Sequence, residues 1–176
     1  NTFLKAQNIN IGTSLNEERF LSIAVDILEK AKKNNCKIIL PIDAFCAKDI
    51  NNYNNISYCK INNVPSKLMI LDVGNKTVEL ISKEIIKSKM LLWNGPLGVS
   101  ENPYFGTGTQ QICRIIEELT NNGVISILGG GDTAAAARRF SISNNFSHIS
   151  TGGGASLELL SGKQLPALKV LGYYER

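Results

Sequence analysis

Short apolar runs alternate with helical segments along this chain, and the alternation is the feature that most limits its fold. An amphipathic helix with Asn16 as its N-cap is predicted over residues 15–35, because apolar residues recur at three- and four-residue intervals. The apolar run at 37–41, stopped by Pro41, is typical of a strand buried on both faces. The alternation predicts a three-layer, Rossmann-like α/β fold: a parallel sheet with helices on both faces.

The remaining elements continue the same order. The Asn-rich stretch 48–66 is predicted as a surface connection with room for one short strand. Further strands are predicted at 68–72, 90–93, 124–128 and 148–150, and helices over 77–88 with Thr77 as cap, over 109–121 closed by Gly123, after Asp132, and from Ala155.

Glycine triplets follow two of these strands. Gly129, Gly130 and Gly131 precede Asp132 and Thr133, and Gly152, Gly153 and Gly154 follow the next strand. Ligands of open parallel sheets bind outside the carboxyl ends of the strands. Glycines there let backbone amides approach a phosphate at a helix start. Asp132 at the same edge suits a bridging Mg²⁺, so a polyphosphate with its metal is predicted.

A plain structural reading competes with this one. The glycines could serve only a tight strand-to-helix turn, with Asp132 capping the helix. A second triplet one strand later favours the phosphate site. A third strand end, from Asn94 through Pro96 and Val99 to Glu101, could line a nucleoside pocket or form an ordinary loop. The chain lacks GxxxxGK[ST], neither triplet completes GxGxxG, and His148 is read as a packed or hydrogen-bonded strand residue.

Composition excludes several other classes. The formal charge of +4 is scattered without a basic stripe, so no nucleic-acid partner is expected. No apolar run is long enough to cross a membrane, and a cytoplasmic protein is expected. The 4 cysteines form no CxxC pair and only 1 histidine is present, which argues against structural zinc and for reduced thiols.

With these segments identified, the chain resembles the C-terminal, nucleotide-binding half of phosphoglycerate kinases nearly from end to end. The motifs that carry the resemblance are Thr2-Phe-Leu-Lys5, Ile11-Gly-Thr-Ser-Leu15, Ile38 to Asp43, Trp93-Asn-Gly-Pro96, Gly98-Val99 with Glu101, Gly129 to Thr133, and Ser147 to Glu158. The resemblance implies magnesium-dependent phosphoryl transfer between ATP and 3-phosphoglycerate, giving ADP and 1,3-bisphosphoglycerate, by a monomer.

The resemblance also implies roles for residues. Asp132 would bind Mg²⁺, and Gly130, Gly131 and Thr133 would face the nucleotide phosphates. Glu101 would bind the ribose. The adenine would lie against Leu15, Leu71, Pro96 and Val99. Asn94 and the helix start at Gly152, Gly153 and Gly154 would act where charge develops. Ile70 replaces a glycine common beside the adenine, and it could narrow that pocket.

Residues 1–176 are thus expected to form one domain of a two-domain kinase whose 3-phosphoglycerate-binding half is absent from this chain. The isolated chain is expected to bind nucleotide weakly and to catalyse poorly. Two alternatives stay open: a nucleotide-binding module without catalysis, regulatory or a degenerate remnant, and, more weakly, a dehydrogenase-like dinucleotide domain.

Overall fold

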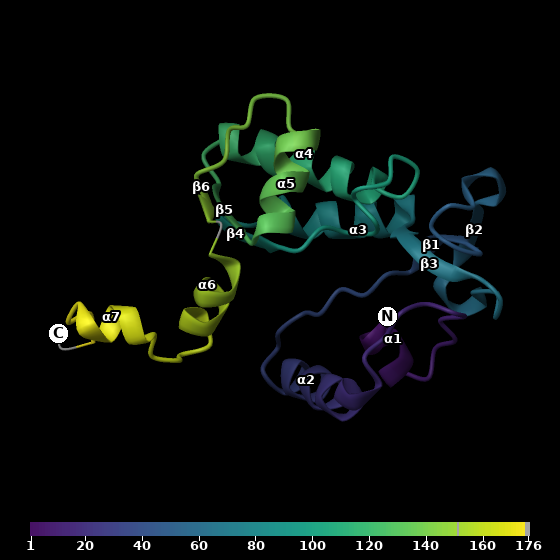
Figure 1. Ribbon diagram of the computed structural model, residues 1–176, viewed down its shortest axis with the longest axis horizontal. Coiled ribbons are helices and arrows are strands. Elements are labelled where there is room, and N and C mark those ends of the chain that lie inside the picture. Colours follow the sequence, from purple (N-terminus) through teal and green to yellow (C-terminus); the bar gives the residue numbers. More distant parts are fainter. Residues whose placement is uncertain (151, 175–176) are drawn as a thin grey trace. The chain divides into compact units, whose positions relative to one another are not determined.

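The computed structural model describes residues 1–150 and 152–174 and has the α/β composition that the sequence predicts (Figure 1). Three short 3-10 helices, η1 (Glu18–Phe20), η2 (Tyr53–Asn55) and η3 (Ile61–Asn63), accompany the main elements. The α-helices are α1 (Thr2–Ala6), α2 (Leu21–Lys33), α3 (Asn75–Ile85), α4 (Thr107–Asn121), α5 (Gly131–Phe140), α6 (Gly153–Leu160) and α7 (Pro166–Val170). The strands are β1 (Asp43–Ala47), β2 (Ser57–Lys60), β3 (Met69–Val73), β4 (Met90–Asn94), β5 (Ile125–Gly129) and β6 (His148–Ser150).

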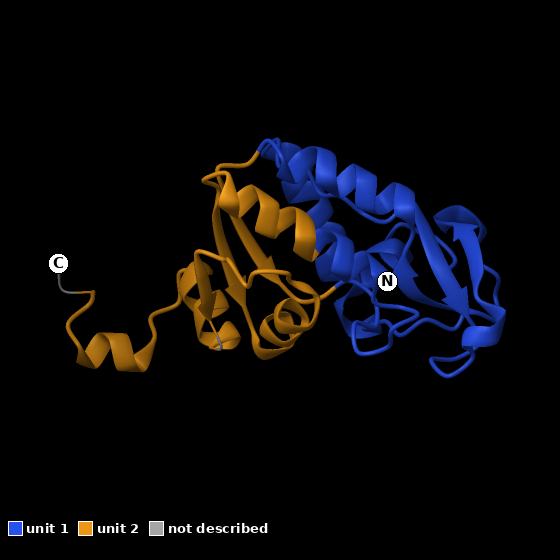
Figure 2. Cartoon of the chain, turned by 90° about the horizontal axis from the view of Figure 1, so that it is seen from above, with its two compact units in different colours: residues 1–87, 97–112 blue, residues 88–96, 113–176 orange. Residues whose placement is uncertain are grey.

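The chain divides into two compact units (Figure 2). Unit 1 holds residues 1–87 and 97–112, and unit 2 holds residues 88–96 and 113–176. Each unit has its own sheet: unit 1 contains β1 to β3, and unit 2 contains β4 to β6. No helix within the described part of the chain has the length and apolar character needed to cross a membrane.

The sheet of unit 2 confirms the predicted parallel architecture. Its strand order is β4-β5-β6, with parallel pairing throughout. Apolar side chains such as Leu128 fill its buried positions, and α5 packs against β5 and β6. Gly123 closes the helix before β5 with a φ of 89°, a conformation that glycine adopts without strain. The strand-turn-helix order around both glycine triplets is therefore as predicted.

The sheet of unit 1 differs from the prediction, because it is antiparallel. Its order is β2-β1-β3, and β1 pairs antiparallel with both neighbours. The predicted strand at 37–41 is wrong: the segment is irregular, four of its five residues are only partly buried and Lys37 is exposed, and no described strand pairs with it. Leu40 packs against the core instead, so the apolar run reflects packing against the core and not hydrogen bonding to a neighbouring strand. The strand in this part of the chain is β1, which begins two residues after the predicted one ends. The short strand predicted within 48–66 is β2.

Helix α3 is capped from a distance. The predicted cap Thr77 is wrong, since α3 begins at Asn75 and Thr77 lies within its first turn. The carboxylate of Asp43, on β1, accepts hydrogen bonds from the amides of Lys76 (2.9 Å) and Thr77 (2.8 Å) and from the Thr77 hydroxyl (2.5 Å). Tyr58 on β2 donates to the same carboxylate at 2.8 Å. Asp43 thus satisfies amides that a local cap would otherwise serve.

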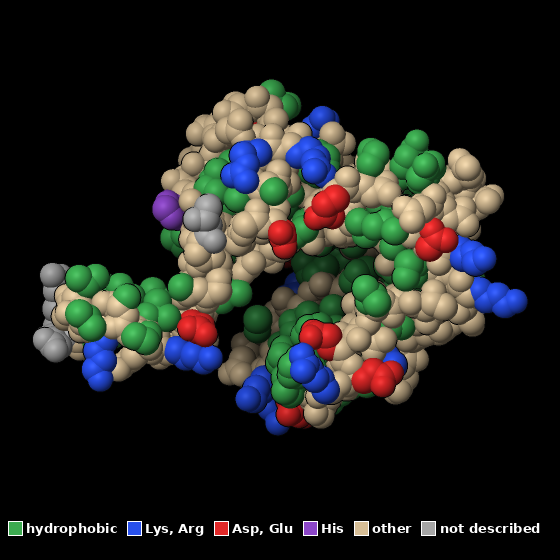
Figure 3. Space-filling view, viewed as in Figure 1, with side chains coloured by type: hydrophobic (Ala, Val, Ile, Leu, Met, Phe, Trp, Pro, Cys, Tyr) green, Lys and Arg blue, Asp and Glu red, His purple; other side chains and the backbone are tan. Residues whose placement is uncertain are grey.

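Helix α2 confirms the amphipathic helix but not its N-cap. The helix begins at Leu21 after η1, with Phe20 at its N-cap position. The Asn16 side chain instead accepts from Lys5 and donates to the Ser14 carbonyl. Only Ala24 of the predicted apolar stripe is buried, while Ile23 and Ile27 remain exposed. Figure 3 shows hydrophobic side chains gathered over α2.

Candidate functional site

Three strands of unit 2 end level with one another. The register pairs Asn94 of β4 with Gly129 of β5, and Gly129 with Ser150 of β6. The residues that follow these positions therefore leave the sheet at one edge. This is the carboxyl edge, at which ligands of parallel sheets bind.

The two glycine turns contact each other at this edge. The Gly130 amide donates to the carbonyl of Ser150 at 3.0 Å. A Cβ on Gly153 would lie 2.6 Å from the Gly130 Cα and 2.7 Å from its nitrogen. Only glycine at 153 permits this approach, so the start of α6 sits directly against the turn that leads into α5. Gly131 and Gly154 have open space where a Cβ would be, and both are exposed.

Side chains around the turn fix its backbone. Gly130, at a φ of 95°, is the N-cap of α5, so the alternative in which Asp132 caps this helix is wrong. The buried Thr133 accepts a hydrogen bond from the Gly95 amide at 2.7 Å, which joins the start of α5 to the end of β4. The Asn94 Oδ1 lies 3.3 Å from the position of a Cβ on Gly130. Pro96, half-buried, follows in the chain. Thr151 of the second motif lies outside the described residues.

Asp132 presents a carboxylate in the first turn of α5. Its side chain is exposed, and it forms no ion pair with any residue that the structure describes. No group of three or more His, Cys, Asp or Glu that could hold a metal occurs in the described part of the chain. One carboxylate beside glycine amides nevertheless fits Mg²⁺, since this ion is commonly held by one or two carboxylates together with substrate phosphates and water.

Unit 1 brings together two of the residues assigned to the adenine. Leu71 on β3 is 6% exposed and packs with Ala47 and Phe105, and the partly buried Val99 packs against the same cluster. The Val99 amide donates to the Leu71 carbonyl at 2.9 Å. Ile70, one residue before Leu71, packs against a different cluster that contains Leu4 and Ile11. The side chains of Ile70 and Leu71 therefore pack in two different hydrophobic clusters.

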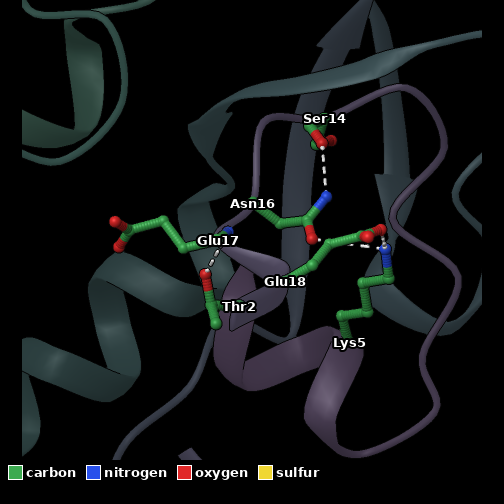
Figure 4. Close-up of polar contacts among 6 residues, drawn as sticks. All are labelled: Thr2, Lys5, Ser14, Asn16, Glu17 and Glu18. Atoms are coloured by element: carbon green, nitrogen blue, oxygen red, sulfur yellow. Dashed lines mark hydrogen bonds and ion pairs between the residues drawn. The ribbon is translucent and has the colours of Figure 1, made fainter. Parts of the chain in front are cut away.

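Leu15 and Glu101, also in unit 1, are exposed, and Leu15 is 84% exposed. The loop that carries Leu15 is held by polar contacts (Figure 4). The Thr2 hydroxyl accepts from the Glu17 amide at 3.1 Å, and the Lys5 ammonium pairs with Glu18 at 2.5 Å. The Asn1 side chain donates to the Leu15 carbonyl at 3.1 Å. The backbone is thus anchored while the Leu15 side chain faces solvent.

Comparison with known proteins decides the family. The family model described as phosphoglycerate kinase matches residues 1–163. The chain belongs to the phosphoglycerate kinase family. It is 48% identical over 168 residues to the phosphoglycerate kinase of Macrococcus caseolyticus and 44% identical over 170 residues to that of Prosthecochloris aestuarii, with 96% and 97% of this chain covered.

Solved phosphoglycerate kinase structures show the same fold. The structure from Coxiella burnetii matches 97% of this chain with a TM-score of 0.89 at 39% identity, and that from Pyrococcus horikoshii matches 97% with a TM-score of 0.78 at 26% identity. The chain covers 43% and 42% of those two structures, and 41% and 43% of the two curated relatives. This chain thus spans about two-fifths of the length of the family members that it matches.

The sequence reasoning missed a buried carboxylate in this member of the family. Asp72, 1% exposed, is the penultimate residue of β3, and its carboxylate accepts from the amides of Val73 (2.8 Å) and Gly108 (2.9 Å). A Cβ on Gly98 would lie 2.4 Å from its Oδ1. Asp72 therefore positions the segment before Val99 and the start of α4. The signal available in the sequence was an aspartate closing an apolar strand. Of the two predictions for His148, the packed side chain is wrong, since His148 is exposed on β6, where it pairs with Ile127 of β5.

Asp72 predicts a pH dependence of stability. Burial raises the pKa of its carboxyl to about 6, against the lowering effect of the amide donors. A group with a raised native pKa stabilises the fold below its unfolded pKa, and this contribution is lost as pH rises through the native value. We expect the loss to be on the order of 3 kcal/mol between pH 4 and 7.

The measurement is the free energy of unfolding in urea across this pH range, for the wild type and Asp72→Asn. Their difference isolates Asp72 from other carboxylates. Asn cannot titrate, so the variant should lack this component, although it loses one acceptor. A wild-type-minus-variant difference that stays flat with pH would contradict the assignment.

Proposed function

We propose that this chain is the C-terminal, nucleotide-binding domain of a phosphoglycerate kinase and that the whole protein transfers a phosphoryl group between ATP and 3-phosphoglycerate. Family membership supports the reaction, since the matched relatives carry that name. The position of the chain within the enzyme is supported by its glycine-rich strand ends. A partner domain would bind 3-phosphoglycerate.

One observation carries the nucleotide site: the close contact between the two glycine turns at the carboxyl edge of the parallel sheet. Gly130 and Gly153 can approach as they do only without side chains. This contact puts the starts of α5 and α6 next to each other, and the positive ends of helices attract phosphate. A turn that only joins a strand to a helix involves a single helix N-terminus. Two adjacent helix N-termini can donate to more than one phosphate group, which suits a polyphosphate.

The proposed roles follow from this arrangement. The turn at Gly130 and Gly131 faces the nucleotide phosphates. The Gly131 amide is the donor, because the Gly130 amide already bonds Ser150. Thr133 holds the turn by accepting from the Gly95 amide. The α6 start at Gly152, Gly153 and Gly154 donates to the phosphoryl group as charge develops on it, and the Asn94 amide contributes at the same edge. Phosphoryl transfer relies mainly on such positioning and charge stabilisation.

Asp132 would hold Mg²⁺ together with phosphate oxygens and water. When bound, Mg²⁺ neutralises phosphate charge during transfer. The residues of unit 1 serve the nucleoside: Leu15, Leu71 and Val99 offer apolar contacts to the adenine, and Glu101 accepts from the ribose hydroxyls. Pro96, which belongs to unit 2, is proposed as a further adenine contact. We also propose that the chain alone turns over poorly, because positioning the acceptor requires the partner domain. A monomeric state and a cytoplasmic location stay predictions.

The test is calorimetric titration of the full chain with ADP, with and without Mg²⁺. We expect Mg²⁺ to strengthen binding, and Asp132→Ala to remove that effect, with binding of the magnesium complex weakened by roughly tenfold or more, the scale of a charge-assisted contact.

Asp26→Ala is the matched control, because it also removes one exposed carboxylate, from α2 rather than from the glycine turn. It should bind as the wild type does. Equal Mg²⁺ enhancement in the Asp132 variant would refute its role as ligand. Binding of NAD in preference to magnesium nucleotide would favour the dinucleotide-domain alternative.

A further inference from the structure

Two cysteines lie within contact distance on neighbouring strands of unit 1. The sulfur atoms of Cys46 on β1 and Cys59 on β2 are 2.9 Å apart, and both thiols are free. A disulfide bond is about 2.05 Å long, so bonding needs an approach of about 0.9 Å. The pairing of β1 with β2 already fixes both backbones: Ala44 lies opposite Cys59, and Cys46 lies opposite Ser57. The two thiols occupy the same face of the hairpin.

We propose that Cys46 and Cys59 form a reversible redox pair that is converted to a disulfide by a low-molecular-weight disulfide such as oxidised glutathione. This reactivity does not depend on the function proposed above. The bond would close the segment from 46 to 59 and tie β2 to β1.

The burial of the two thiols sets the order of events. Cys46 is fully buried within the cluster that contains Ala44 and Ile61, whereas Cys59 is only partly buried at the edge of that cluster. Burial, followed by the neighbouring Cys59, raises the pKa of the Cys46 thiol. The thiolate is the attacking species in thiol-disulfide exchange. Cys59 therefore reacts first with an external disulfide, and Cys46 is the resolving thiol.

The exchange is balanced in two steps. The Cys59 thiolate attacks one sulfur of oxidised glutathione, which forms a mixed disulfide and releases one glutathione thiol. The Cys46 sulfur, having lost its proton, then attacks the Cys59 sulfur and expels the second glutathione. The protein loses two hydrogen atoms, and one glutathione disulfide is reduced to two thiols. The short distance between the sulfurs favours the second step over persistence of the adduct.

The experiment treats the full-length Cys36→Ser variant with oxidised glutathione under native conditions, followed by intact mass and a non-reducing tryptic map. The substitution removes the exposed thiol, which would otherwise link two chains. We expect a loss of about 2 Da, the two hydrogens of the exchange. The map should show the peptide 38–48, with Cys46, joined to the peptide 49–60, with Cys59. Dithiothreitol should restore both free peptides.

A variant that also carries Cys59→Ser is the matched control, and it should keep its mass. A stable glutathione adduct on Cys59 with Cys46 still reduced would overturn the proposal, and so would a folded protein in which both thiols remain unmodified. A linkage of Cys113 to either cysteine would also overturn it.

Discussion

Gly153→Ala should destabilise unit 2 and weaken ADP binding together. The added Cβ would lie 2.6 Å from the Gly130 Cα, and both neighbouring atoms at this distance belong to backbone, which cannot rotate away. Either α6 or the turn before α5 must shift, and the hydrogen bond from the Gly130 amide to Ser150 is strained with it. We expect a loss of about 1–3 kcal/mol in the free energy of unfolding. ADP affinity should fall by roughly tenfold, or about 1.4 kcal/mol.

Gly154→Ala provides the matched control on the same helix. Nothing lies within 4 Å of the position of its Cβ, and alanine is the better helix former by about 1 kcal/mol. Unfolding in urea should therefore shift in opposite directions for the two variants, and calorimetry with ADP measures the binding. If Gly153→Ala matched Gly154→Ala in stability, the close contact of the two glycine turns would be disproved, and with it the observation that carries the proposed site.

Asp43→Ala should have the largest effect on stability in unit 1. The carboxylate is 1% exposed and accepts from two amides of α3, from the Thr77 hydroxyl and from Tyr58. Burial alone would raise the pKa of Asp43, but the hydrogen bonds from Thr77, Tyr58 and Lys76 hold it below the usual value. Its removal leaves buried donors without a partner. We expect a loss of about 3 kcal/mol or more, measured by urea unfolding.

Tyr58→Phe removes a single bond to the same carboxylate from an exposed ring, so it should cost about 1 kcal/mol or less. Hydrogen exchange separates the two variants further. The first turn of α3 should lose protection in Asp43→Ala and keep it in Tyr58→Phe. Equal protection of the Lys76 and Thr77 amides in both variants would show that Asp43 does not cap this helix.

Unit 2 was the predictable part of this chain. Strands β4 and β5 are mainly apolar runs that lead directly into glycine turns, and β5 pairs in parallel with β4 and β6. In unit 2 the local apolar pattern predicts the strands correctly, because the turn that ends each strand is adjacent to it in the sequence. The glycine triplets could be located in the same way.

Unit 1 was not predictable to the same degree, because its elements depend on distant partners. The apolar run at 37–41 has the composition of a strand but pairs with no described strand, whereas β1 forms between β2 and β3. Thr77 resembles a local cap, but Asp43, 34 residues earlier, provides the acceptor. The periodicity of apolar residues indicates which residues are buried and which face of a helix they occupy. It does not indicate which strands pair with each other.

The sequence by itself determined the α/β class, the strand and helix order of unit 2, and the positions of the glycine-rich turns that we propose bind phosphate, because propensity, apolar pattern and glycine positions act over a few residues. Only the tertiary structure decided the antiparallel sheet of unit 1, the buried Asp72 and the contact between Gly130 and Gly153. It also decided the pairing of Cys46 with Cys59. Such contacts join segments that are separate in the chain, and their energies depend on burial and distance, which exist only once the chain has folded.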